Sequence, residues 1–218
     1  MTHTERLKKI SKEYLEIICP YLLQYEMLTQ EFPVAVLNEI RSAFTHIAKY
    51  YVTESDKEKE KSIKKTEDHF KRILRDCYKY VCSAYDDEYL RFGETYKGID
   101  LSLINDGDFL PKLEETRKKA VEKLSIARTR ELDTGIKEID ETKFENELLK
   151  LYQDAYIEYA NLYEIIAEAQ VHAEKLRKKT IEKEKKAKKK EKIYEVLTWV
   201  FGIATLVGVA LTIVGFTL

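Results

Sequence analysis

The stretch that decides the architecture is Val196–Leu218, VLTWVFGIATLVGVALTIVGFTL, in which no side chain is charged. As an α-helix this stretch would extend roughly 34 Å, enough to cross a hydrocarbon core of about 30 Å. The preceding run, Glu174–Lys192, holds eleven Lys or Arg and four Glu. Such a basic flank stays on the cytoplasmic side of a membrane. The sequence therefore predicts a single-pass protein of the inner (plasma) membrane, with its N-terminus and body in the cytoplasm.

Small and hydroxylated residues recur along one face of this predicted transmembrane helix, at steps of three or four residues. Such residues can be tolerated in a membrane helix without a role, can let helices pack closely, or can line a narrow pore. The last two arrangements require a homo-oligomer. No charged ring is present, so a charge-based selectivity filter is not predicted. The candidate pore or interface residues are Thr198, Gly202, Thr205, Gly208, Thr212 and Gly215.

The basic run gives the chain a strong charge asymmetry. The net charge is −1, but Glu174–Lys192 alone carries +7, which leaves −7 on residues 1–173. An acidic body is a poor general binder of nucleic acid, so the basic run is the evident polyanion site. It can equally be a juxtamembrane segment attracted to anionic lipid. The candidate polyanion-binding or lipid-binding residues are Lys185, Lys186, Lys188, Lys189 and Lys190.

Composition predicts an all-α protein. Charged residues make up 35% of the chain, with seven Gly and three Pro, which is typical of long helices and offers few turns for a sheet. Cys19, Cys77 and Cys82 lack the paired spacing of a zinc site and do not suggest a disulfide framework. We therefore expect small buried thiols in a reducing compartment, and neither a metal nor a cofactor is predicted.

Apolar periodicity divides the chain into helices. Amphipathic patterns predict helices over residues 4–30, 33–51, 62–96, 111–132 and from 141 onward. In the last of these, apolar or small residues repeat every three or four positions from Phe144 to Leu176. This rhythm is typical of a bundle helix or of a coiled coil. The expected organisation is a helical bundle over 1–140, a long helix or coiled-coil stalk over 141–192, and a transmembrane helix over 193–218.

The second predicted helix contains the sequence LNEIRSAFTHI, in which Arg41 and His46 are separated by four residues. An Arg-x4-His motif in this apolar setting resembles the motif of HEPN domains, which are helical bundles. The resemblance covers this helix, and Ser42 stands where active members often carry Asn. It implies that Arg41 would hold phosphate and His46 would act as the acid–base of a metal-independent ribonuclease. The alternative is a polar pair that flanks a helix–helix interface, with no catalytic residue.

The resemblance also suggests a function, because HEPN-like domains are common in prokaryotic antiphage and toxin systems. It implies a homo-oligomeric, non-enzymatic membrane effector of abortive infection, whose body senses a nucleotide or oligonucleotide signal. A partner nucleotidyltransferase is also implied. The terminal helices would form an ion channel that depolarises the inner membrane. The alternatives are a membrane-tethered ribonuclease that uses Arg41 and His46, or a coiled-coil membrane scaffold.

Overall fold

The computed structural model describes residues 2–132 and 141–215, and within these it describes the side chains of 2–132, 143–203 and 205. The described residues are 93% helical and contain no strand, which confirms the all-α prediction. In chain order the elements are α1 (His3–Glu13), the π-helical turn η1 (Tyr14–Ile18), α2 (Cys19–Thr29), α3 (Val34–Val52), α4 (Asp56–Thr95), the 3-10 helix η2 (Leu101–Gly107), α5 (Phe109–Leu132) and α6 (Glu141–Gly215).

The first three elements form one continuous helical run that includes Pro20. A proline inside an α-helix removes a backbone donor and crowds the preceding turn. Here Pro20 lies in the first turn of α2, directly after the wider π-helical turn, in which the backbone N–H of Cys19 bonds to the carbonyl of Tyr14. The π-helical turn accommodates the proline, and the run ends at Gln30 in the left-handed conformation, at φ 59°.

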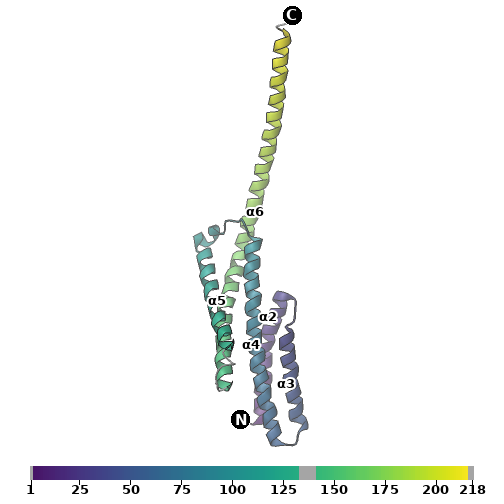
Figure 1. Cartoon of the computed structure of the whole chain (residues 1–218), viewed down its shortest axis with the longest axis vertical. Helices are drawn as coiled ribbons and strands as arrows, with labels where there is room; N and C mark the ends of the chain where they lie inside the picture. The colour runs from purple at the N-terminus through teal and green to yellow at the C-terminus, as the bar shows by residue number, and fades with distance from the viewer. Residues whose placement is uncertain (1, 133–140, 216–218) are drawn as a thin grey trace.

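The long helix α4 is the axis on which the other helices pack. Helix α3 lies along its first half and α6 along its second half, and α5 runs alongside α6 (Figure 1). Helix α4 begins earlier than the expected residue 62, because Ser55 caps it by accepting a hydrogen bond from the backbone N–H of Glu58 at 3.5 Å. Asp56 and Glu58 then place negative charge near the helix N-terminus, which is a favourable position.

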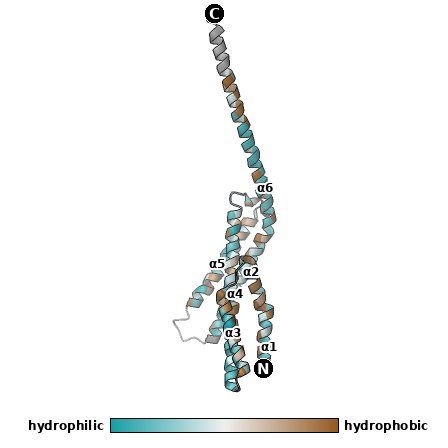
Figure 2. Ribbon diagram, turned by 90° about the vertical axis from the view of Figure 1, so that its right-hand side faces the viewer, coloured by the Kyte–Doolittle hydropathy of each residue, from teal (hydrophilic) through white to brown (hydrophobic). Residues whose placement is uncertain are grey.

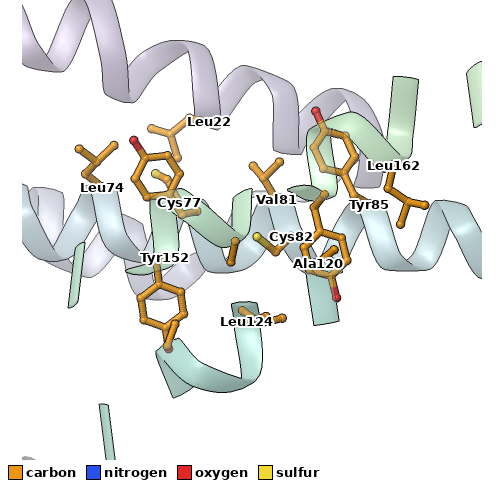
Figure 3. Close-up of a cluster of buried hydrophobic side chains, with 14 of the residues drawn as sticks. Leu22, Leu74, Cys77, Val81, Cys82, Tyr85, Ala120, Leu124, Tyr152 and Leu162 are labelled. Carbon is orange, nitrogen blue, oxygen red and sulfur yellow. The ribbon is translucent and has the colours of Figure 1, made fainter. Parts of the chain in front are cut away.

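The core between α4, α5 and α6 follows the predicted apolar rhythm. The side chains at Phe144, Leu148 and Tyr159 are buried, as are the small ones at Ala155, Ala169 and Ala173. The aromatic stripe of α4 is also mainly core, with Tyr78, Tyr85, Phe92 and Tyr96 buried. Figure 3 shows part of this core, where Cys77 and Cys82 pack among Leu and Tyr side chains. The two thiols are thus small buried apolar groups, and burial raises the pKa of each to about 12.

Helix α6 packs inside the bundle only along its first half. Leu176 is the last half-buried apolar residue against the core, and from Ile181 onward every described side chain is exposed. The helix continues as a single projecting rod (Figure 1). Along this rod a hydrophilic segment is followed by a hydrophobic one (Figure 2).

The predicted membrane span requires correction. Among the described residues, no helix combines the length and the apolar character needed to cross a bilayer. The exposed apolar side chains that are described at the end of α6 lie between Ile193 and Ile203. They also continue a helix whose preceding turns are densely charged. The predicted transmembrane helix, the ion channel and the inner-membrane location are therefore wrong.

Candidate functional site

The clearest polar site lies between α3 and α4. It consists of Glu39 and His46 from α3 and of His69 and Arg72 from α4, and we call it the histidine cluster. Glu39 and His46 are seven residues apart, and His69 and Arg72 are three apart, so each pair shares one side of its helix. The packing of α3 on α4 brings these two sides together.

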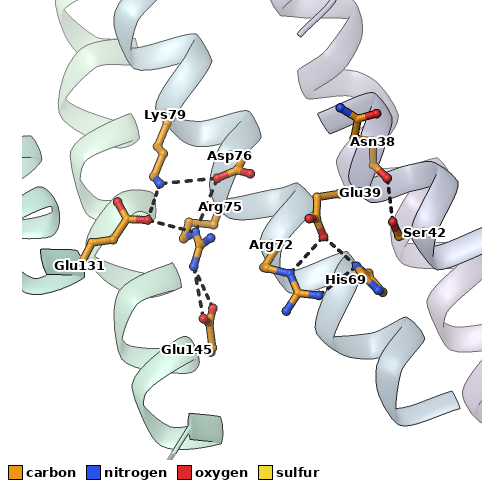
Figure 4. A network of polar contacts seen from close by, with 10 residues as sticks. All are labelled: Asn38, Glu39, Ser42, His69, Arg72, Arg75, Asp76, Lys79, Glu131 and Glu145. Carbon is orange, nitrogen blue, oxygen red and sulfur yellow. Dashed lines mark hydrogen bonds and ion pairs between the residues drawn. The ribbon is translucent and has the colours of Figure 1, made fainter. Parts of the chain in front are cut away.

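Glu39 is the central acceptor of the histidine cluster. One of its carboxylate oxygens lies 2.7 Å from Nδ1 of His69 and accepts a hydrogen bond from Nε of Arg72 at 3.0 Å (Figure 4). Nη2 of Arg72 is also 2.9 Å from Nδ1 of His69. Because a carboxylate is the stronger acceptor, we assign the Nδ1 proton to the bond with Glu39, and the contact between Arg72 and His69 is then not a hydrogen bond, since a guanidinium only donates. His69 is thus held in one orientation by Glu39.

His46 stacks on the oriented ring of His69, with 5.3 Å between the ring centroids and 23° between the ring planes. Partial burial, followed by the positive charges of His69, Lys65 and Lys49, lowers the pKa of His46. The His46 imidazole is therefore neutral near pH 7, the form that can accept a proton. Burial opposes the ionisation of Glu39, but the hydrogen bonds from His69 and Arg72 outweigh this effect and lower the pKa of its carboxyl.

Arg41 does not belong to the histidine cluster. Positions five apart on a helix are separated by roughly 140° around its axis, and Arg41 is exposed while His46 turns toward α4. Among the contacts that the described residues make, none joins these two side chains. A single chain therefore does not bring together the predicted Arg–His pair, and His46 has His69 and Arg72 as its neighbours instead.

The Arg-x4-His spacing indicates residues of α3 alone, and it does not reveal the residues that α4 supplies. His69 and Arg72 share a face of α4, and Glu39 precedes His46 by two helical turns. These spacings are visible in the sequence. Which helix faces which is not visible, and that information was needed to pair the two sets.

A second polar network lies farther along α4 and fastens α5 and α6 to it (Figure 4). Nη1 of Arg75 donates to Glu145 at 3.0 Å, and Nζ of Lys79 donates to Glu131 at 2.5 Å. The hydroxyl of the buried Tyr152 donates to the other oxygen of Glu131, also at 2.5 Å. Burial opposes the ionisation of Glu131, but Lys79 and Tyr152 outweigh it and lower its pKa. Because cations and carboxylates are paired, this network has the character of a structural fastening.

The predicted polyanion site lies entirely on the projecting part of α6. We call residues 175–192 the basic segment. Lys185, Lys186, Lys188, Lys189 and Lys190 are all exposed there, and no other helix packs against this part of α6. Arg177 pairs with Glu174 at 3.5 Å, at the point where the helix leaves the bundle. The five lysines are therefore open to a ligand from every side.

The six residues predicted to line a pore all fall near the end of α6. Thr198, Gly202 and Thr205 are exposed, and the hydroxyls of Thr198 and Thr205 each donate to the carbonyl four residues earlier, at 2.8 Å. Gly208, Thr212 and Gly215 lie outside the residues whose surroundings the structure describes. Within the described part of the chain, no three His, Cys, Asp or Glu side chains are placed to hold a metal ion.

Comparison with known proteins gives this chain no relative: no family model, no curated protein and no solved structure matches it. The described helices also carry no feature that identifies a HEPN-like fold. The resemblance therefore rests on the residues of α3 quoted above and stays a prediction.

Proposed function

We propose that this protein is a non-enzymatic effector that binds an oligonucleotide through the basic segment of α6. The observation that carries the proposal is the position of this segment, which projects beyond an acidic bundle with its lysines exposed. Its length is roughly 27 Å, over which a single nucleic-acid strand presents about one phosphate every 3.4 Å. The segment is thus long enough to lie along several consecutive phosphates.

The charge of the body supports a localised mode of binding. Residues 1–173 carry −7 and repel a polyanion, whereas Glu174–Lys192 carries +7. An approaching nucleic acid is therefore steered to the projecting helix and away from the bundle. Lysines that contact phosphates supply affinity without sequence readout. The proposed ligand is therefore recognised by its charge and length and not by its base sequence. Such recognition is enough for a protein that responds to the presence of an oligonucleotide.

The test is the salt dependence of binding to a labelled single-stranded RNA, followed by fluorescence anisotropy. Replacing the five lysines Lys185, Lys186, Lys188, Lys189 and Lys190 by Gln should reduce the slope of log Kd against log salt concentration by about 3.5. A matched control replaces five exposed lysines of the body by Gln, for the same change in net charge, and should leave the slope unchanged. The control residues are Lys8, Lys9, Lys57, Lys64 and Lys123.

Three results would overturn the proposal. The first is equal loss of RNA binding in both variants, which would mean that overall charge governs association. The second is absence of RNA binding by the full chain. The third is binding of anionic lipid vesicles in preference to RNA, which would assign the basic segment to a lipid surface.

A second candidate function is phosphodiester cleavage at the histidine cluster. The observation that favours it is a neutral His46 stacked on an oriented His69, with Arg72 beside them to attract phosphate. Two histidines of this kind can share the roles of general base and general acid. Loss of RNA cleavage in His46→Ala and His69→Ala, with cleavage kept in Arg41→Ala, would assign the reaction to this cluster. Loss in Arg41→Ala as well would instead support the predicted Arg–His pair.

A further inference from the structure

One face of α3 is apolar and uncovered. Val34, Leu37, Phe44 and Tyr51 are respectively 68%, 51%, 70% and 73% exposed, although apolar side chains of this size are usually core. Arg41 and Ala48, also exposed, complete a row with steps of three and four residues. This is the spacing of a helix that packs along a partner helix. We call this row, Val34, Leu37, Arg41, Phe44, Ala48 and Tyr51, the α3 seam.

The bundle itself does not use the α3 seam. Helix α3 packs on α4 through its opposite face, where Val36 and Ala43 are buried. Among the described helices, α4 is the one whose backbone runs alongside α3. An amphipathic helix normally turns one apolar stripe inward and a polar face outward. Here α3 has two apolar stripes, and the second one has no partner within the chain.

We propose that the α3 seam pairs antiparallel with the α3 seam of a second copy of this chain. The row is self-complementary when it is reversed, because its steps read the same in both directions. A twofold axis between Arg41 and Phe44 brings every member opposite another member. In this register Val34 faces Tyr51, Leu37 faces Ala48 and Arg41 faces Phe44.

The single charge in the seam selects the antiparallel arrangement. In a parallel pair the two Arg41 guanidinium groups would meet at the centre, where like charges removed from water are strongly unfavourable. In the antiparallel pair each Arg41 lies against the ring of Phe44 from the other copy, which is an attractive cation–π contact. Arginines of the described bundle make contacts of the same kind, with Arg117 4.4 Å from the ring centre of Tyr89 and Arg130 4.8 Å from that of Phe144.

The size of the seam fits a dimer that forms and separates. From their exposed fractions, the four large apolar side chains would bury roughly 500 Å² per copy, given about 150–250 Å² for a whole aromatic residue. The total of about 1,000 Å² is at the lower limit for a specific interface. The dimer is therefore concentration-dependent. It also buries Arg41 at the interface while His46 stays against α4, so Arg41 is an interface residue and not a phosphate ligand.

Disulfide trapping tests the pairing and its direction in the full chain, in a Cys19→Ser background because Cys77 and Cys82 are buried. Copies with Arg41→Cys are mixed with copies with Phe44→Cys and treated with a mild oxidant. We expect a cross-linked heterodimer in the mixture and little cross-linking in either variant alone. Cross-linking of each variant alone would show parallel pairing, and no cross-linking in any sample would refute the α3 interface.

Sedimentation of the full chain without added cysteines gives the strength of the dimer. Phe44→Lys should weaken dimerisation at least about tenfold, since aromatic side chains at the centre of an interface dominate its energy. The control is Val171→Lys, which also replaces an exposed apolar side chain by a charged one but lies outside the seam. It should have no effect on dimerisation. A dimer insensitive to Phe44→Lys would overturn the proposal. RNA binding by the basic segment serves as an independent check, because it does not depend on the seam.

Discussion

At the scale of the residue, His46 is placed where its positive charge is penalised. It is partly buried, it stacks on His69, and Lys65 and Lys49 act on it through their positive charge. In the sequence, the spacing of His46 from Arg41 indicated a candidate functional residue. The structure instead ties its chemistry to a histidine twenty-three residues farther along the chain. This partner could not be predicted without knowing which face of α4 meets α3.

The lowered pKa of His46 predicts a loss of stability in mild acid. The unfolded chain binds a proton at this residue near pH 6.5, before the folded chain does, so protonation favours unfolding. The contribution is complete above that pH and is lost as the pH falls toward the folded-state pKa. The free energy of unfolding, measured with urea between about pH 7 and 5, should therefore fall more steeply for the natural chain than for His46→Gln. Identical slopes would refute this role.

The hydroxyl of the buried Tyr152 makes a hydrogen bond that contributes to stability. Its ring is fully buried and its hydroxyl donates to Glu131, which also holds Lys79. Tyr152→Phe keeps the packing and removes one hydrogen bond, so we expect a loss of about 1 kcal/mol in the free energy of unfolding. Tyr194→Phe is the control, because Tyr194 is exposed and should change nothing. Equal stability of Tyr152→Phe and the natural chain would mean that Lys79 alone satisfies Glu131.

At the scale of the element, periodicity located the helices and their inward faces well. The three-and-four rhythm of α6 correctly predicted buried Phe144, Leu148 and Ala155. Apolar spacing did not show the π-helical turn that precedes Pro20 in the first turn of α2. It also placed the start of the third helix at residue 62, although the Ser55 cap begins α4 at Asp56. These errors concern local backbone geometry, which apolar spacing does not encode.

Small residues in the core set the distance between α5 and α6. Ala120, Ala127 and Ala155 are fully buried, so the helices approach closely at these points. Ala155→Leu adds a large side chain where there is no space, and we expect it to cost about 1–3 kcal/mol. Ala167→Leu makes the same change at an exposed position of α6 and should cost little. Thermal denaturation of both variants makes the comparison, and an equal effect would show that α5 can move aside.

At the scale of the whole molecule, the sequence correctly predicted an all-helical body and a long helix after residue 141. The predicted membrane span was wrong, because no helix among the described residues combines the length and the apolar character needed to cross a bilayer. Charge counts did identify the basic segment, since clustered lysines need no knowledge of packing. The α3 seam was missed for the opposite reason, because the apolar residues of α3 fill two stripes and a sequence does not show which one is covered.

Truncation after Leu176 tests the separation of the bundle from the rest of α6. Because residues beyond this point add nothing to the described core, the melting temperature should change by less than about 2 °C. The maximum dimension from small-angle scattering should fall by roughly 60 Å, the length of the helix removed at 1.5 Å per residue. A large fall in melting temperature would mean that the far end of α6 folds back onto the bundle.

Because α6 runs unbroken from the core to its far end, the bundle fixes the direction in which every later side chain points. Each residue along the helix turns the next by about 100°. Inserting one residue just after Leu176 would therefore rotate residues 177–192 of the basic segment relative to the α3 seam. It would also move them about 1.5 Å farther from the bundle. Inserting seven residues would nearly restore the original direction of these side chains, about two helical turns farther from the bundle. The projecting part of α6 is thus a rigid extension of the bundle, and the core sets the direction in which its side chains point.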